Sequence, residues 1–188
     1  MNLTVLALAC ALLGEPPSAA YMYPPVIPVA AATEVQLGGY DFTPDMEFLS
    51  PDPHVRIANL GPPGEFIVAP PPYWFGQKSM TAPFPIPREV TARIDVTKKM
   101  TPGFAHWQVA NLGGASGCVP FLVAAGNIAI ENRRRDDPQP LESLPVTVAA
   151  RIGKIAEIDD YHFAATRGGL VTAELITHRI GSALRGAI

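Results

Sequence analysis

Short runs of alternating apolar and polar residues indicate β-strands along most of the chain. The clearest is Arg88 to Val96, in which positions 90, 92, 94 and 96 are apolar and the positions between them are polar. A period of two places these apolar side chains on one face of a strand. Shorter runs cover Thr33 to Leu37, His54 to Leu60, Phe66 to Ala69, Phe104 to Leu112 and Cys118 to Ala124. Turn residues separate them, so the pattern predicts an immunoglobulin-like antiparallel β-sandwich over residues 21–124.

A second, smaller unit is predicted over residues 145–188. Alternation continues in Pro145 to Ile152, Tyr161 to Ala165 and Val171 to Leu175, which predicts three more strands. Three short strands bury little surface, so this unit is expected to be truncated. Residues 125–144 contain the charged run Glu131 to Pro138 and are expected to be a solvated linker.

The first twenty residues are predicted to be a signal peptide. Leu3 to Leu13 is an apolar run too short to cross a bilayer, and Ser18-Ala19-Ala20 supplies small residues for cleavage after Ala20. A buried first strand and a lipoprotein cleavage at Cys10 are the alternatives. Cleavage predicts a secreted, periplasmic or cell-surface protein that has no membrane span once the leader is removed.

The composition argues against several other structures and partners. The chain has 21 prolines and 16 glycines, which argues against long helices, and its formal net charge of −3 argues against nucleic acid as a partner. Removal of the leader would leave Cys118 as the one cysteine and exclude an internal disulfide. Cys118 is expected to be a small buried apolar residue in its strand.

The second unit resembles the start of a bacterial pre-peptidase C-terminal domain. The resemblance lies in Leu144 to Ile152, Ile158 to Phe163 and Leu175 to Leu184, with Ala150 in place of the usual glycine and Arg185 where an acidic residue is common. It implies a jelly-roll-like β-sandwich that extends beyond the strands found here. It also implies that the chain accompanies a secreted peptidase.

The first unit is similar to the immunoglobulin-like modules that precede such domains in large exported bacterial proteins. The similarity lies in Leu37-Gly38-Gly39-Tyr40-Asp41, Pro71-Pro72-Tyr73-Trp74-Phe75-Gly76 and Trp107-Gln108-Val109-Ala110-Asn111.

One cluster of side chains is a candidate for metal binding. Glu157, Asp159 and Asp160 lead into a predicted strand, and hard cations such as calcium need several oxygens within reach. A solvated turn is the alternative. A zinc site is not expected, because the four histidines lack metal-ligand spacing, and no other cofactor is expected.

A second candidate is an aromatic loop. Tyr73, Trp74 and Phe75 follow three prolines and could bind a cell-surface protein or a glycan if exposed, or fill the core if buried.

No catalytic residues are predicted. Ser116 lies in Gly114-Ala115-Ser116-Gly117, which lacks the G-x-S-x-G pattern of a nucleophile elbow. We therefore expect a non-catalytic exported β-sandwich module with a structural, spacing or surface-interaction role in a larger secreted protein. The alternatives are an accessory region of a secreted peptidase or hydrolase and a glycan- or protein-binding adhesin module.

Overall fold

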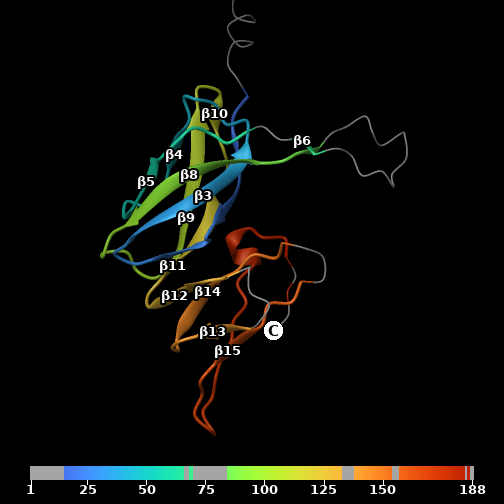
Figure 1. The fold of residues 1–188 in the computed structure, drawn as a ribbon. Coiled ribbons are helices and arrows are strands. Elements are labelled where there is room, and N and C mark those ends of the chain that lie inside the picture. Colours follow the sequence, from blue (N-terminus) through green and yellow to red (C-terminus); the bar gives the residue numbers. More distant parts are fainter. Residues whose placement is uncertain are drawn as a thin grey trace, which may run out of the picture.

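The computed structural model describes residues 15–65, 68–69, 84–132, 138–153, 157–184 and 186. Within these residues the regular elements are β-strands and one short 3₁₀-helix, η3 (His178–Ile180) (Figure 1). The prediction of an all-β chain is therefore confirmed. In this part of the chain no helix has the length and apolar character needed to cross a membrane.

The first unit contains two sheets. One has four antiparallel strands in the order β1-β3-β8-β5. The bounds of these strands are β1 (Ser18–Tyr23), β3 (Ala32–Tyr40), β5 (Val55–Asn59) and β8 (Arg88–Val96). The strand predicted over Arg88 to Val96 is found with those bounds.

The other sheet has the order β10-β9-β11-β2, and β4 pairs with β9 as well. Its strands are β2 (Val26–Pro28), β4 (Glu47–Leu49), β9 (Gly103–Asn111), β10 (Gly114–Ala115) and β11 (Val119–Ala124). All pairs are antiparallel except β2 with β11. The predicted β-sandwich architecture is therefore confirmed.

The core lies between these two sheets. Its largest fully buried side chains are Trp107, Phe121, Ile27, Leu37, Ile94, Val35, Val90, Val109 and Val123. Within a strand the buried residues are spaced two apart, because successive residues of a strand face opposite sides. Aromatic rings fill the middle: Phe48 lies 5.8 Å from Phe42 edge-on and 6.1 Å from Trp107, between ring centroids.

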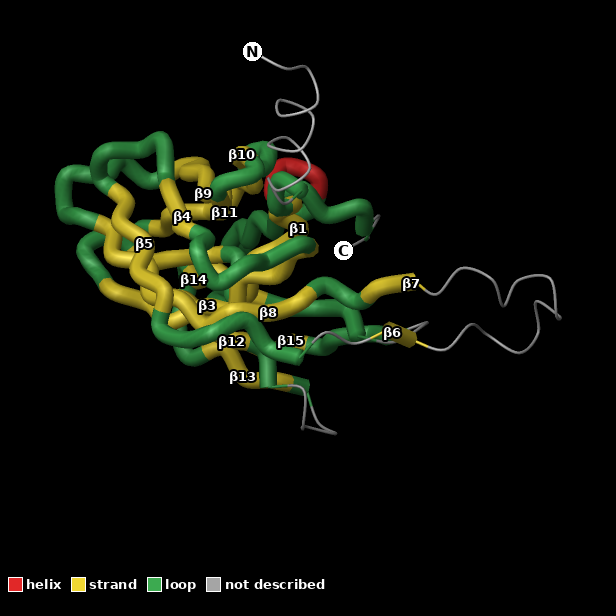
Figure 2. The backbone as a smooth tube through the Cα atoms, turned by 90° about the horizontal axis from the view of Figure 1, so that it is seen from above, coloured by secondary structure: helices red, strands yellow, loops and turns green. Residues whose placement is uncertain are grey.

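A hairpin projects from the body of the sandwich. It consists of β6 (Val68–Ala69) and β7 (Phe84–Pro85), which pair antiparallel (Figure 2). Tyr73, Trp74 and Phe75 lie between these strands and outside the described residues, so the predicted aromatic platform stays a prediction.

The second unit consists of two parallel strand pairs, β12 with β14 and β13 with β15. Their bounds are β12 (Asn127–Ile130), β13 (Gln139–Leu141), β14 (Val146–Ala149) and β15 (Tyr161–Phe163). Residues 125–144, expected to be a linker, thus contribute β12 and β13. The strand expected over Val171 to Leu175 is not formed. These residues are solvent-exposed, and no strand of the described chain lies beside them to complete a ladder.

The expectation that Cys118 is buried was wrong, because its side chain is exposed. In β11 the side chains of Phe121 and Val123 face the core. Cys118 lies an odd number of residues from both, so it falls on the opposite face, where its Sγ lies 3.5 Å from Oε1 of Gln108.

Candidate metal centre

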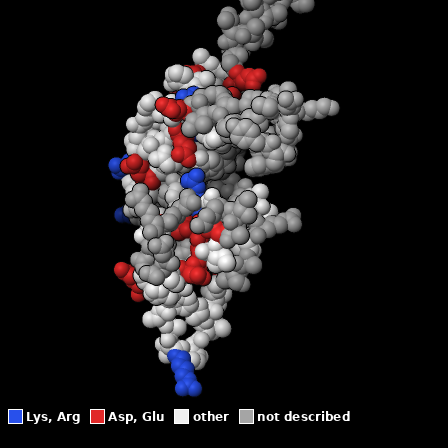
Figure 3. Space-filling view, turned by 45° about the vertical axis from the view of Figure 1, so that its right-hand side comes forward, with Lys and Arg blue, Asp and Glu red and all other residues white. Residues whose placement is uncertain are grey.

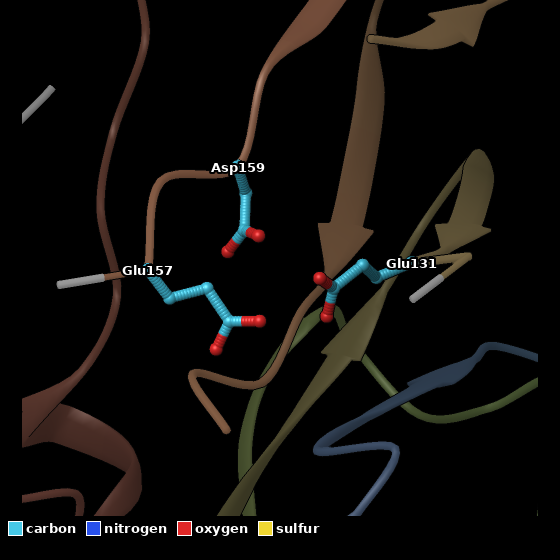
Figure 4. Close-up of side chains that lie close together, drawn as sticks. All are labelled: Glu131, Glu157 and Asp159. Atoms are coloured by element: carbon cyan, nitrogen blue, oxygen red, sulfur yellow. The ribbon is translucent and has the colours of Figure 1, made fainter. Parts of the chain in front are cut away.

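Three carboxylates meet where the second unit packs against the sandwich. Glu131 directly follows β12, while Glu157 and Asp159 lie in the segment that leads into β15 (Figure 4). One oxygen from each side chain lies within 4.8 Å of the others, and all three residues are partly buried. The structure therefore brings together two of the three residues predicted for calcium and adds Glu131.

The third predicted residue, Asp160, lies outside this group. Its side chain is exposed, and its backbone carbonyl accepts a hydrogen bond from the backbone N–H of Gln139 at 2.8 Å. Asp159 and Tyr161 are partly buried, whereas Asp160 between them is exposed.

Backbone groups hold two of the carboxylates in place. Glu131 extends the β12–β14 ladder through its N–H, which donates to the carbonyl of Ala149 at 2.9 Å. Its Oε2 accepts a hydrogen bond from the backbone N–H of Arg151 at 2.9 Å, and Oε2 of Glu157 accepts one from the N–H of Gly153. Carboxylate oxygens are hard ligands of the kind that calcium prefers, and each of the three side chains brings one into the group.

Tyr161, the first residue of β15, lies beside this group. Its hydroxyl oxygen is buried and has no hydrogen-bond partner within the described part of the chain. Burial first, and then the negative charges of Glu131 and Asp159, raise the pKa of Tyr161 to about 12. The pKa of Tyr161 therefore depends on the charges of two of the three carboxylates, Glu131 and Asp159.

On the sandwich side, Arg151 lies over two tyrosines of β1. Its guanidinium carbon is 5.9 Å from the ring centroid of Tyr21 and 5.6 Å from that of Tyr23. The Tyr21 hydroxyl donates to Oε1 of Glu89 at 2.5 Å, which pins the ring. Cation–π contacts of this kind join the segment after β14 to the edge strand of the first sheet.

Two further contacts attach the second unit to the other sheet of the sandwich. A small apolar cluster unites Val26 of β2, Ala124 of β11 and Ala149 of β14, with Leu122 and Ile128 packed against it. The guanidinium carbon of Arg179, in η3, lies 5.3 Å from the ring centroid of Phe104 in β9. The carboxylates are thus held at a junction that both units build.

One face of the molecule carries more acidic than basic side chains (Figure 3). On the face in Figure 3, acidic side chains run along the molecule and gather near its middle, with fewer lysines and arginines among them. Within the described residues this is the one group of three or more potential metal-ligating side chains, and it includes no histidine. Its chemistry suits a hard cation better than zinc.

Sequence reasoning missed Glu131 because it begins the charged run that predicted a linker. A signal was present, since Glu131 directly follows the apolar-containing segment Asn127 to Ile130. A strand fixes the backbone position of an acidic residue at its end, whereas a solvated linker does not.

We expect calcium to raise the thermal midpoint of the full chain and Asp159→Asn to remove this effect. At a calcium concentration about tenfold above the dissociation constant, one site stabilises the folded state by roughly 1.4 kcal/mol. Differential scanning calorimetry with calcium and then with a chelator measures the shift. Asp160→Asn is the matched control, because it removes an adjacent charge outside the group. An unchanged midpoint in the wild-type chain at millimolar calcium would rule out the site.

A second expectation concerns alkaline pH. The pKa values of Tyr21 and Tyr161 are both raised to about 12, by burial first and then by carboxylates that include Glu89 and Glu131. The unfolded chain ionises near pH 10, so this contribution to stability is present below pH 10 and is lost as pH rises towards 12. The phenolate absorbance of the wild type should show one more late-titrating tyrosine than that of Tyr161→Phe. Titration of every tyrosine near pH 10 in the folded protein would contradict this.

A scan against protein-family models gave no match for this chain, and a search of curated proteins gave none either.

Proposed function

We propose that the chain is a non-catalytic, exported β-sandwich module, and that its second unit makes the contact with the rest of a larger secreted protein. The observation that carries this proposal is the uneven distribution of exposed apolar side chains. Nine of the thirteen large exposed hydrophobic residues of the described chain lie in the second unit. These nine are Ile130, Leu144, Ile152, Ile158, Phe163, Leu170, Val171, Leu175 and Leu184.

The strand arrangement of the second unit supports the same proposal. Its two sheets are parallel pairs, and neither pair has a third strand within the described residues. Parallel sheets normally have both faces covered, and a two-stranded sheet has little stability of its own. The open edges and the apolar side chains beside them therefore fit further strands, added by hydrogen bonding along β13 or β15.

The partner that we propose is a set of further β-strands of the same polypeptide. Ile158 precedes β15 and Phe163 is its last residue, and their exposed fractions are 82% and 41%. A strand laid along this edge would cover both side chains and pair the free backbone groups. The resemblance to a pre-peptidase C-terminal domain points in the same direction, and an accessory role beside a secreted peptidase is the alternative.

Reading the coding frame past Ile188, followed by hydrogen exchange, tests the proposal. The frame should continue with more strands, and the backbone amides of Tyr161 to Phe163 should exchange more slowly in the longer protein than in the 188-residue chain. Amides of β9 are the internal control, because β9 is already paired on both sides. A stop codon directly after Ile188, or equal exchange at β15, would refute it. A catalytic domain in the continued frame would favour the accessory role.

A further inference from the structure

The segment just before the predicted cleavage point forms part of the sandwich. Ser18 pairs with Tyr40 and Ala19 with Gly39, as the first half of β1. Ala19 packs against the main core, and Pro17 is buried. Residues predicted to leave with a signal peptide therefore take part in the fold.

Residues that are distant in the sequence contact this segment. A Cβ atom on Gly39 would lie 2.3 Å from the carbonyl oxygen of Ser18, closer than real Cβ contacts come. The absence of a side chain at position 39 therefore makes room for the backbone of residue 18. In addition, Nδ2 of Asn111 donates to the carbonyl of Glu15 at 3.2 Å.

The predicted cleavage bond lies in the middle of β1. The register against β3 passes from the Ala19–Gly39 pair to the Tyr21–Gly38 pair, so Ala20 is a bulge residue without a partner, and it is exposed. Hydrolysis after Ala20 would remove half of the strand. Gly39 and Tyr40 of β3 would then lose their partners on that side.

We propose that residues 15–20 are retained in the mature protein and that any leader is removed upstream of Glu15. This inference rests on the proposed export. Removal is hydrolysis of one peptide bond by the leader peptidase of the host, in which water supplies the hydroxyl of the new carboxyl end and the proton of the new amine. The inference keeps the predicted export and shifts the processing point towards the N-terminus.

The first test is the mass of the exported chain. The full coding sequence is expressed in a bacterium with a general secretory pathway, and the intact mass of the exported protein locates its N-terminus. A start at or before Glu15 supports the inference, and a start at Tyr21 overturns it. A cytoplasmic chain that keeps Met1 overturns the proposed export, in which case the stability measurement below tests the inference separately.

Two neighbouring variants provide the second test. Ala20→Asp places a charge where cleavage after Ala20 requires a small residue, so an upstream processing point predicts the wild-type N-terminus and a mature mass higher by the Ala-to-Asp difference. Accumulation of the unprocessed Ala20→Asp chain would overturn the inference. Ala19→Asp forces a charge against the core, so it should lower the thermal midpoint by roughly 5 °C, whereas the exposed Ala20→Asp leaves it unchanged. Equal midpoints for the two variants would also overturn the inference, because neither residue would then belong to the folded protein.

Discussion

Replacing Trp107 with alanine is expected to lower the free energy of unfolding by about 3–5 kcal/mol. The indole of Trp107 is fully buried in β9, between the strands β4 and β11. It packs on Phe48, and truncation would leave a cavity between the two sheets of the sandwich. Because Trp107 belongs to the main core, the whole first unit should unfold earlier. Denaturant unfolding followed by far-ultraviolet circular dichroism measures the change.

Two companion variants separate the size of the ring from its polarity. In the described part of the chain Nε1 of Trp107 has no hydrogen-bond partner, so Trp107→Phe removes a buried donor that is unpaired. Its loss should be smaller, about 1–2 kcal/mol, because the polar atom leaves together with part of the ring. His106→Ala, next in the chain but exposed, should change stability by about 0.5 kcal/mol or less. A Trp107→Ala chain with the wild-type midpoint would show that the sheets do not pack through this residue.

Trp107 also illustrates which parts of the fold can be predicted from the sequence. β8 and β9 are long and lie with one face on the core, so burial imposes a period of two that is visible in the sequence. β12 and β13 have three or four residues and pair in parallel with strands further along the chain. In runs this short, the alternation of apolar and polar residues is too brief to identify a strand. Their pairing depends on the docking of the second unit, which is a tertiary effect.

The candidate metal centre divides in the same way. Glu157 and Asp159 are near neighbours in one segment, so their proximity is visible in the sequence. Glu131 joins them only because the β12–β14 pairing brings the end of β12 to the same place. Asp160 was wrongly grouped with Glu157 and Asp159, because the sequence does not show which of these neighbouring side chains point toward Glu131. Cys118 was wrongly predicted to be buried for a similar reason, because its apolar neighbours in the sequence do not show which face its side chain takes.

Substituting Gly38 with alanine is the second large expected effect, a loss of about 1–3 kcal/mol. A Cβ atom at position 38 would lie 2.4 Å from two ring atoms of Tyr21, which covers this glycine from β1. The ring cannot move aside freely. Its hydroxyl is bonded to Glu89, and Arg151 of the second unit lies over its face. Gly61→Ala is the matched control, because nothing lies within 4 Å of a Cβ at that position.

A double-mutant cycle identifies the cause of that loss. If the clash with the Tyr21 ring is responsible, Gly38→Ala should cost little in a Tyr21→Ala background, and the two single effects should not add. The Tyr21→Ala background also tests the contact between the two units, because it removes one of the two rings beneath Arg151. Arg151→Ala should therefore destabilise the Tyr21→Ala chain less than the wild type. Fully additive effects at all three positions would mean that the glycine, the ring and the arginine act separately, and that β1 does not couple the sandwich to the second unit.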